Sequence, residues 1–245
     1  MDNNHIDLTS LTQTFSELLV RLEQSAPADF DRQEPANSPR LLAEAMSRVL
    51  QMLEILISKQ PQRFDADDDI HQLGDYGLNL LADLSSLASK LGQDDLSREL
   101  EGLTFPFALW IARHGATLRA LEPVVNTISR QANSVREPIA LEQLYELTGE
   151  IQDATALSLQ QDQDKSNPGR AWRILLLNRA IIATRSHRPE LIEVAYDNLL
   201  RHLPEEAPRF FREGMQQMDA LNYPQPVRNV VEKYYQIWSV ARTLH

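Results

Sequence analysis

Apolar residues recur every three or four positions along most of this chain, and prolines repeatedly interrupt the pattern. Residues between Thr9 and Gln24 follow this helical spacing, and a second, broader apolar stripe runs from Pro39 to Pro61. Only eight glycines occur in 245 residues. This scarcity favours helices joined by proline-marked turns over a sheet with glycine-rich corners. The sequence therefore predicts an all-α fold of about ten or eleven helices, packed as antiparallel helical hairpins.

The last 80 residues contain four predicted helices, with proline in every break between them. They run from about Gly169 to Thr184, Pro189 to Leu203, Glu205 to Leu221 and Pro226 to Leu244. Alternate helices begin roughly 37 residues apart, which is the scale of stacked helix hairpins in tetratricopeptide or HEAT arrays. The small and aromatic residues of a tetratricopeptide unit do not align with either helix pair. We therefore expect a hairpin array, with tetratricopeptide-like or HEAT-like stacking as one form of it.

Two stretches that are poor in apolar residues divide the chain. Ser25 to Ser38 has the composition of a flexible linker, and Asp162 to Gly169 (DQDKSNPG) is the clearest internal break. The predicted organisation is a helix and linker in residues 1–37, an acidic helical bundle in 38–165 and a helical-hairpin region in 166–245. The alternative is that the last two parts form one continuous domain.

Negative charge is concentrated in the first two thirds of the chain. The net charge is −11, to which residues 1–165 contribute −14 and residues 166–245 contribute +3. Nucleic acids and anionic membranes are themselves negative, so an acidic surface disfavours non-specific binding to either. We therefore expect no nucleic-acid partner.

The absence of cysteine excludes disulfides, thiolate metal sites and cysteine nucleophiles, and it is compatible with a cytoplasmic protein. No run of about 18 apolar residues could span a bilayer. Polar residues follow Met1, where a signal peptide would carry an apolar segment. These features predict a cytoplasmic location without membrane insertion.

The most apolar run of the chain, TFPFALWIA, leads into the tripeptide Arg113-His114-Gly115. Over about five residues this tripeptide resembles the Arg-His-Gly signature of the histidine phosphatases. The resemblance implies that His114 accepts a phosphoryl group and that Arg113 holds the phosphate. It also implies an α/β sheet, but no later strand or second His-Gly pair follows here, and the further cationic groups that phosphoryl transfer needs are not evident.

The same residues are also explained by the end of a helix. Gly115 lies where a left-handed residue would terminate the helix, and Arg113 and His114 in its last turn complement the helix dipole. Thr104 is predicted to cap the start of this helix, followed by Pro106 in the first turn. Trp110, between the two ends, is predicted to be buried.

One acidic stretch resembles a metal site in composition. Its residues are Asp65, Asp67, Asp68, Asp69, His71 and Asp75. The calcium-loop pattern fails, because Ile70 occupies the position of the required glycine and Tyr76 that of the bidentate glutamate. No two histidines share the three- or four-residue spacing of a metal pair on a helix. We therefore predict no metal and no cofactor, and we interpret the carboxylates as a solvated helix N-terminus.

Five arginines fall within or just after one predicted helix: Arg170, Arg173, Arg179, Arg185 and Arg188. Apolar residues between them describe a buried face, so the arginines are predicted mainly as its solvated complement. Glu205-Glu206 are likewise predicted to be solvated surface. Arginine and aromatic side chains are enriched where interfaces concentrate binding energy. The candidate binding residues are Arg170, Trp172, Arg173, Arg179, Tyr234, Tyr235 and Trp238.

Repeated hairpins without a complete catalytic constellation favour a non-catalytic protein–protein interaction module or adaptor. Its protein partner is not identified by the sequence, and the unequal charge of the two parts also permits a homo-oligomer. One alternative is an enzyme of phosphoryl transfer that uses Arg113 and His114. The other is a helical protein that binds a small apolar ligand between hairpins.

Overall fold

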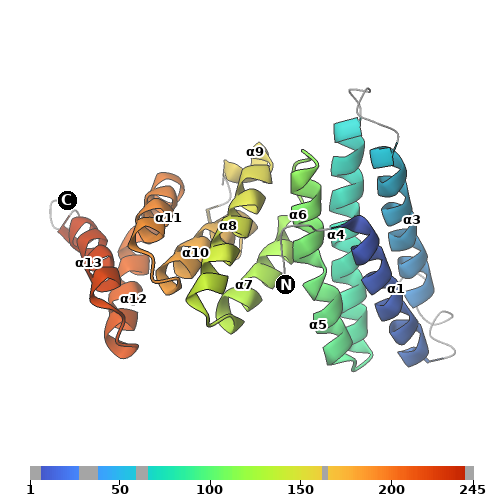
Figure 1. Ribbon diagram of the computed structural model, residues 1–245, viewed down its shortest axis with the longest axis horizontal. Helices are drawn as coiled ribbons and strands as arrows, with labels where there is room; N and C mark the ends of the chain where they lie inside the picture. The colour runs from blue at the N-terminus through green and yellow to red at the C-terminus, as the bar shows by residue number, and fades with distance from the viewer. Residues whose placement is uncertain (1–6, 28–37, 59–65, 162–164, 241–245) are drawn as a thin grey trace. The chain divides into compact units, whose positions relative to one another are not determined.

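The computed structural model describes residues 7–27, 38–58, 66–161 and 165–240 (Figure 1). In these ranges eleven α-helices have nine or more residues, and no strand occurs apart from an isolated parallel bridge between Leu118 and Thr155. The predicted all-α fold and the predicted number of helices are therefore confirmed. None of the helices in this described part combines the length and the hydropathy needed to cross a bilayer.

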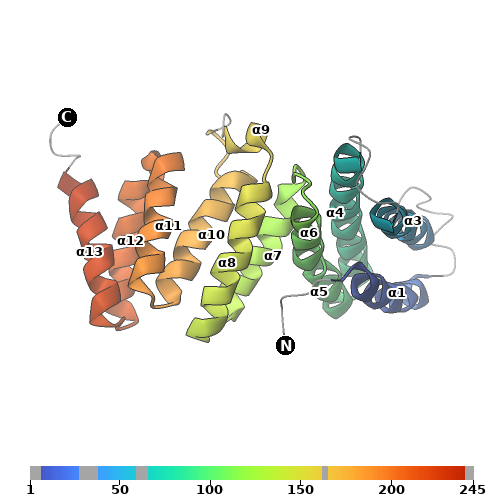
Figure 2. The same cartoon turned by 45° about the horizontal axis from the view of Figure 1, so that its top comes forward.

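Successive helices pack against each other in the first and in the last part of the described chain. The first seven are α1 (Leu8–Ser25), α3 (Pro39–Ser58), α4 (Ala66–Lys90), α5 (Asp94–Gly102), α6 (Thr104–Arg113), α7 (Leu121–Ser134) and α8 (Pro138–Ala154). They are followed by α9 (Leu157–Gln160), α10 (Ala171–Arg185), α11 (Pro189–His202), the 3-10 helix η2 (Pro204–Glu206), α12 (Ala207–Ala220) and α13 (Gln225–Val240). Helix α3 packs against α4, α10 against α11 and α12 against α13, and Figure 2 shows the last pair side by side. A tetratricopeptide-like or HEAT-like repeat remains a prediction.

Local signals set several helix ends as predicted. Ser38 caps α3, because its Oγ accepts the backbone N–H of Leu41 at 3.4 Å and its carbonyl accepts that of Leu42. Gly115 has a φ of +79°, which glycine adopts without the steric cost of a Cβ. Ala116 donates its N–H to the carbonyl of Ile111, as expected for the Schellman termination of a helix.

The predicted start of the central helix is wrong in one detail. Thr104 is the first residue of α6 and is not its cap, because α5 ends only two residues earlier and leaves Leu103 as the junction. The fully buried hydroxyl of Thr104 donates to the carbonyl of Glu101 and lies 2.6 Å from the hydroxyl of Thr127. Its hydrogen bonds therefore tie α5 and α7 to the start of α6.

Two glycines allow α4 and α6 to approach closely. A Cβ added to Gly77 would lie 2.7 Å from Cε1 of Phe107, and one added to Gly74 would lie 2.8 Å from Cδ1 of Ile111. Phe107 and Ile111 are one turn apart on α6 and are both fully buried. The side chains of α6 thus occupy the space that the two glycines leave on α4.

The chain divides into two compact units. Unit 1 comprises the described residues of Met1–Ile128 and Glu150–Gln163, and unit 2 those of Ser129–Gly149 and Asp164–His245. Most of the predicted linker, residues 28–37, and the first residues of the predicted break, 162–164, lie outside the described residues. The three-part organisation inferred from the sequence remains a prediction.

The core of unit 2 contains a cluster of aromatic side chains. Tyr196, which is 1 % exposed, packs edge-on against Phe210, Phe211 and Tyr234, with ring centroids 5.0 to 5.5 Å apart. Its hydroxyl lies 2.8 Å from that of Thr184. Burial raises the pKa of Tyr196 because the phenolate would lose its hydration. This cluster joins α11, α12 and α13.

Candidate functional site

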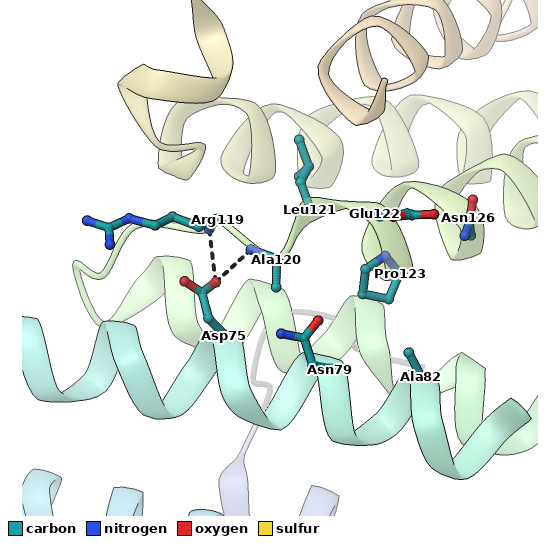
Figure 3. Close-up of a pocket in the computed structure, with 9 residues that line it drawn as sticks. All are labelled: Asp75, Asn79, Ala82, Arg119, Ala120, Leu121, Glu122, Pro123 and Asn126. Atoms are coloured by element: carbon teal, nitrogen blue, oxygen red, sulfur yellow. Dashed lines mark hydrogen bonds between the residues drawn. The ribbon is translucent and has the colours of Figure 1, made fainter. Parts of the chain in front are cut away.

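An open groove of about 610 Å³ lies in unit 1 beside α4 and the first two turns of α7 (Figure 3). From α4 it is lined by Asp75, Asn79 and Ala82, and from the following segments by Arg119, Ala120, Leu121, Glu122, Pro123 and Asn126. About half of the lining is polar. The volume falls in the range of small-ligand and peptide sites.

Asp75 fixes one wall of the groove. Its Oδ1 accepts the backbone N–H of Arg119 at 2.9 Å and that of Ala120 at 2.8 Å, as the dashed lines in Figure 3 show. These residues directly precede α7, so the carboxylate holds the start of that helix against α4. Hydrogen bonds from N–H groups to a carboxylate are stronger than those between neutral groups, so Asp75 stabilises this wall.

His71 supports the same segment from one turn earlier on α4. It is 4 % exposed, and its Nδ1 lies 2.5 Å from the carbonyl oxygen of Thr117 and 2.8 Å from the Thr117 hydroxyl. Because a carbonyl oxygen only accepts, Nδ1 carries the proton and donates it. Nε2 lies 3.7 Å from Oδ2 of Asp75. His71 and Asp75 therefore hold the segment before α7 together, in a structural role.

The acidic stretch that resembles a metal site is only partly described. Asp65 and the side chains of Asp67 and Asp68 lie outside the described residues, and Asp69 is exposed. No group of three histidine, aspartate or glutamate side chains within reach of one metal ion occurs in the part of the chain that the structure describes.

Four polar side chains remain available in the groove. Asn79, Arg119, Glu122 and Asn126 are exposed, and none of their side chains bonds to another group among the described residues. Asn79 projects from α4, whereas Glu122 and Asn126 project from α7, one turn apart (Figure 3). The groove thus offers two amides and a carboxylate on the two helices, and a guanidinium from the segment before α7.

Arg113 and His114, the phosphatase-like candidates, lie apart from the groove lining. Nε and Nη2 of Arg113 donate to the two carboxylate oxygens of Glu150 at 2.7 and 2.9 Å, and this bonding raises the pKa of the guanidinium. The ring of His114 stacks on Trp110 at 4.1 Å, and its Nδ1 lies 2.8 Å from the Trp110 carbonyl. Trp110 is buried, as predicted. Both candidates thus have partners at the end of α6.

Most of the five arginines in and beside α10 do not form the predicted solvated face, and only Arg188, at 53 % exposed, matches it. Arg170 and Arg173 are 11 % and 16 % exposed, and they lie against Glu205 and Glu206. Arg185 donates to the carbonyl of Val135 at 2.7 Å. Helix α10 has neighbours on more than one side, so its arginines point at other helices and segments rather than at solvent. The prediction that Glu206 is solvated surface is also wrong, because its side chain pairs with Arg173 and is only 17 % exposed.

The remaining arginine candidate lies against an aromatic ring. The guanidinium carbon of Arg179 is 4.6 Å from the ring centroid of Tyr145, a cation–π arrangement. Gly149 leaves the room for it, since a Cβ there would lie 3.2 Å from Nη2 of Arg179. Arg179 thus links α10 to α8 inside unit 2.

The aromatic candidates differ in exposure. Trp172 is 3 % exposed, and its ring meets His202 edge-on at 5.4 Å. Tyr234 is 5 % exposed and donates its hydroxyl to Oδ1 of Asp197 at 2.6 Å; burial, followed by this carboxylate, raises its pKa. Tyr235 and Trp238, on the same helix, are half-buried. The seven candidates therefore do not converge on one site: Arg170 and Arg173 lie beside Glu205 and Glu206, whereas Tyr234, Tyr235 and Trp238 belong to α13.

The groove was missed by sequence reasoning because its residues share no motif. The sequence indicates Asp75 only as part of an acidic stretch that resembles a metal site, and Asn79 and Asn126 are 47 positions apart. Only the packing of α7 near α4 brings the two amides to one place, and no local pattern encodes that packing.

Comparison with models of protein families, with characterised proteins and with solved structures finds no match to this chain.

Proposed function

We propose that this chain is a helical protein–protein interaction module that binds an extended peptide segment of its partner in the groove between α4 and α7. The observation that carries this proposal is the pair of exposed amides, Asn79 and Asn126, that line one open groove from two helices. An amide side chain has both donors and an acceptor, so it can bond to the N–H and the C=O of a peptide in extended conformation.

Charge indicates what side chain the peptide would carry. Glu122 is exposed in the groove, and unit 1 has 23 acidic and 10 basic residues, a net charge of −13. A lysine or arginine of the peptide, next to the backbone bound by Asn79 and Asn126, would lie near the carboxylate of Glu122. The negative electrostatic field of unit 1 would increase the association rate of such a peptide. The peptide therefore carries a basic residue beside Glu122, away from Arg119.

The neighbours of Arg113 favour this function over phosphoryl transfer. A phosphate bound by Arg113 would have to displace Glu150, which already satisfies the guanidinium with two hydrogen bonds. The groove also differs from an enclosed apolar pocket, since it is open and about half polar. A cytoplasmic location, inferred from the absence of cysteine, is part of the proposal.

A peptide library tests the proposal directly. Randomised 12-residue peptides displayed on phage would be selected against the full chain, and the binding of the selected peptides measured by calorimetry. We expect basic peptides whose affinity falls about tenfold or more in the double variant Asn79→Ala/Asn126→Ala, since each amide contributes about 1 kcal/mol through its hydrogen bonds.

Asn133 provides the matched control. It lies on the same helix as Asn126, two turns later, and its amide already donates to the carbonyl of Ser129. Asn133→Ala should leave the affinity unchanged. Selected peptides that bind the double variant as tightly as the unmodified chain would contradict the proposal, and so would a library from which no binder emerges.

A further inference from the structure

Helix α3 carries two seams on opposite faces, each with alternating spacings of four and three residues. The first seam is buried and consists of Pro39, Ala43, Met46, Leu50 and Leu53. The second consists of Leu41, Ala45, Arg48, Met52 and Ile55. Because the second seam is displaced by two residues, it points about 200° away from the first. Its large apolar members are exposed, with 48 % of Leu41, 51 % of Met52 and 41 % of Ile55 accessible to solvent.

Helix α4 widens this exposed seam into a groove. Met52, Ile55 and Leu56 from α3 and Asp69, Gln72 and Leu73 from α4 line an open groove of about 550 Å³, whose surface is mostly apolar. Tyr76 lies one turn beyond Leu73 on the same face and is 51 % exposed. Contiguous apolar surface of this kind on a folded protein marks a binding site for another chain.

The spacing of the seam identifies the secondary structure of its occupant. Apolar side chains that alternate at intervals of four and three residues along a straight helix form the seam of a coiled coil. The apolar side chains of a second helix have the same spacing and can pack between those of the seam. The side chains of an extended strand repeat every two residues and do not fit this spacing. The occupant is therefore an amphipathic helix.

Arg48 disfavours a second copy of the same seam. Its side chain is 77 % exposed, and its Nη2 lies 4.0 Å from Oε2 of Glu44, one turn earlier on the same helix. Arg48 is the centre of the seam, seven residues from both Leu41 and Ile55. Symmetric pairing of two α3 helices would place the Arg48 side chains opposite each other, in either relative direction. Like charges opposed in this way disfavour pairing, so the occupant carries a negative group at that position.

We propose that the exposed seam of α3, together with Leu73 and Tyr76 of α4, binds an amphipathic helix of a different protein. That helix carries apolar residues at heptad spacing and a carboxylate opposite Arg48. Ile55 lies two turns after Arg48, and Asp69 lines the groove together with it, so a basic residue of the bound helix is favoured there. This site is separate from the groove of Asn79 and Asn126, and it binds a helix rather than an extended peptide.

A charge-exchange experiment on the full chain tests this inference. The probes are two synthetic 21-residue helical peptides with leucine at heptad positions a and d, which differ only in a glutamate or a lysine at the central d position. We expect the unmodified chain to bind the glutamate peptide about threefold to fivefold more tightly in fluorescence anisotropy, and Arg48→Glu to reverse this preference. Met52→Asp should weaken both peptides about tenfold or more.

Val194 provides the control substitution, because it is equally exposed, at 60 %, but lies on α11 in unit 2. Val194→Asp should leave both affinities unchanged, and circular dichroism should show the same helix content for every variant. The double variant Asn79→Ala/Asn126→Ala should also bind both peptides normally, which separates this inference from the proposed function.

Three results would overturn the inference. The first is the absence of binding to either peptide at a concentration of about 0.1 mM, where coiled-coil partners of ordinary affinity associate. The second is a preference between the peptides that does not change in Arg48→Glu. The third is a dimer of the unmodified chain, seen by sedimentation equilibrium and lost in Met52→Asp, because a second copy would then occupy the seam.

Discussion

At the scale of single residues, the pair Arg173–Glu206 shows how tertiary packing changes the chemistry of a side chain. The guanidinium of Arg173 donates to both carboxylate oxygens of Glu206, and the two side chains are only 16 % and 17 % exposed. Hydrogen bonding to Arg173 lowers the pKa of Glu206 below its ordinary value. Folding therefore favours the ionised form of this carboxyl.

Glu206→Gln should make the stability of the protein less dependent on pH. Since the pKa of Glu206 is lower in the folded than in the unfolded chain, its contribution is complete above the ordinary pKa of 4.5 and disappears as the pH falls through the folded value. We expect the substitution to cost about 2 kcal/mol at pH 7 and progressively less below pH 4.5. Urea unfolding at several pH values would measure the difference.

Glu213 supplies the comparison for this experiment. It forms an ion pair with Arg209 one turn earlier on α12, but both side chains are more than half exposed. Glu213→Gln should therefore have no measurable effect at any pH. If the two substitutions have equal effects, or if the effect of Glu206→Gln does not change with pH, the ion pair does not stabilise the fold as described.

At the scale of the element, several helix ends were predictable and the helix contacts were not. Ser38, Gly115 and Pro189 set the ends of α3, α6 and α11 through their own side chains or backbone, so the sequence nearby is sufficient to locate them. The exposed seam of α3 illustrates the opposite case. Met52 and Ile55 follow the same four-and-three spacing as the buried residues of this helix, and only the positions of neighbouring helices decide which of the two seams is covered.

The candidate sites failed to emerge from the sequence for the same reason. The apolar pattern of α10 by itself predicts that its arginines face solvent, but acceptors such as Glu206 lie far away in the sequence. Asn79 and Asn126 carry no chemical signal of their own. Their significance comes from an arrangement of α4 and α7 that depends on the close packing of other helices in unit 1.

Gly77→Ala should test that close packing. The new Cβ would meet the ring of Phe107 at 2.7 Å, which is too close for van der Waals contact, so α4 and α6 must separate or Phe107 must move. We expect a loss of about 1–3 kcal/mol in the free energy of unfolding, as for other overpacked cores. Chemical denaturation would measure it.

A second substitution separates this clash from the effect of alanine itself. Phe107→Leu makes space at the contact, and as a single substitution it should lower the free energy of unfolding. The double variant Gly77→Ala/Phe107→Leu should lose less stability than the two single variants lose in sum. Gly102→Ala provides the matched control, because an added Cβ there meets nothing within 4 Å. This substitution should leave the free energy of unfolding unchanged or raise it slightly. Additive effects of Gly77→Ala and Phe107→Leu would contradict the proposed contact.

At the scale of the whole molecule, the two compact units do not follow the order of the sequence. Ser129–Gly149 belongs to unit 2, although the strongest break in composition comes later, at residues 162–169. The contacts of this segment explain the assignment. Ser129 accepts a hydrogen bond from Asn178 at 2.6 Å, and Glu142 accepts two from Arg188 at 2.9 and 3.0 Å. A boundary read from composition alone does not detect such contacts.

Truncated chains distinguish the compact unit from the boundary suggested by composition. We expect a fragment of residues 129–245 to melt about 10 °C or more above a fragment of residues 166–245, because the shorter one loses the partners of Asn178 and Arg188 together with the buried ring of Tyr145. Circular dichroism would measure both midpoints. A fragment of residues 150–245 is the control, since it adds chain length without those contacts and should melt with the shortest fragment. Equal midpoints for residues 129–245 and 166–245 would instead place the boundary of the folded unit near residue 166.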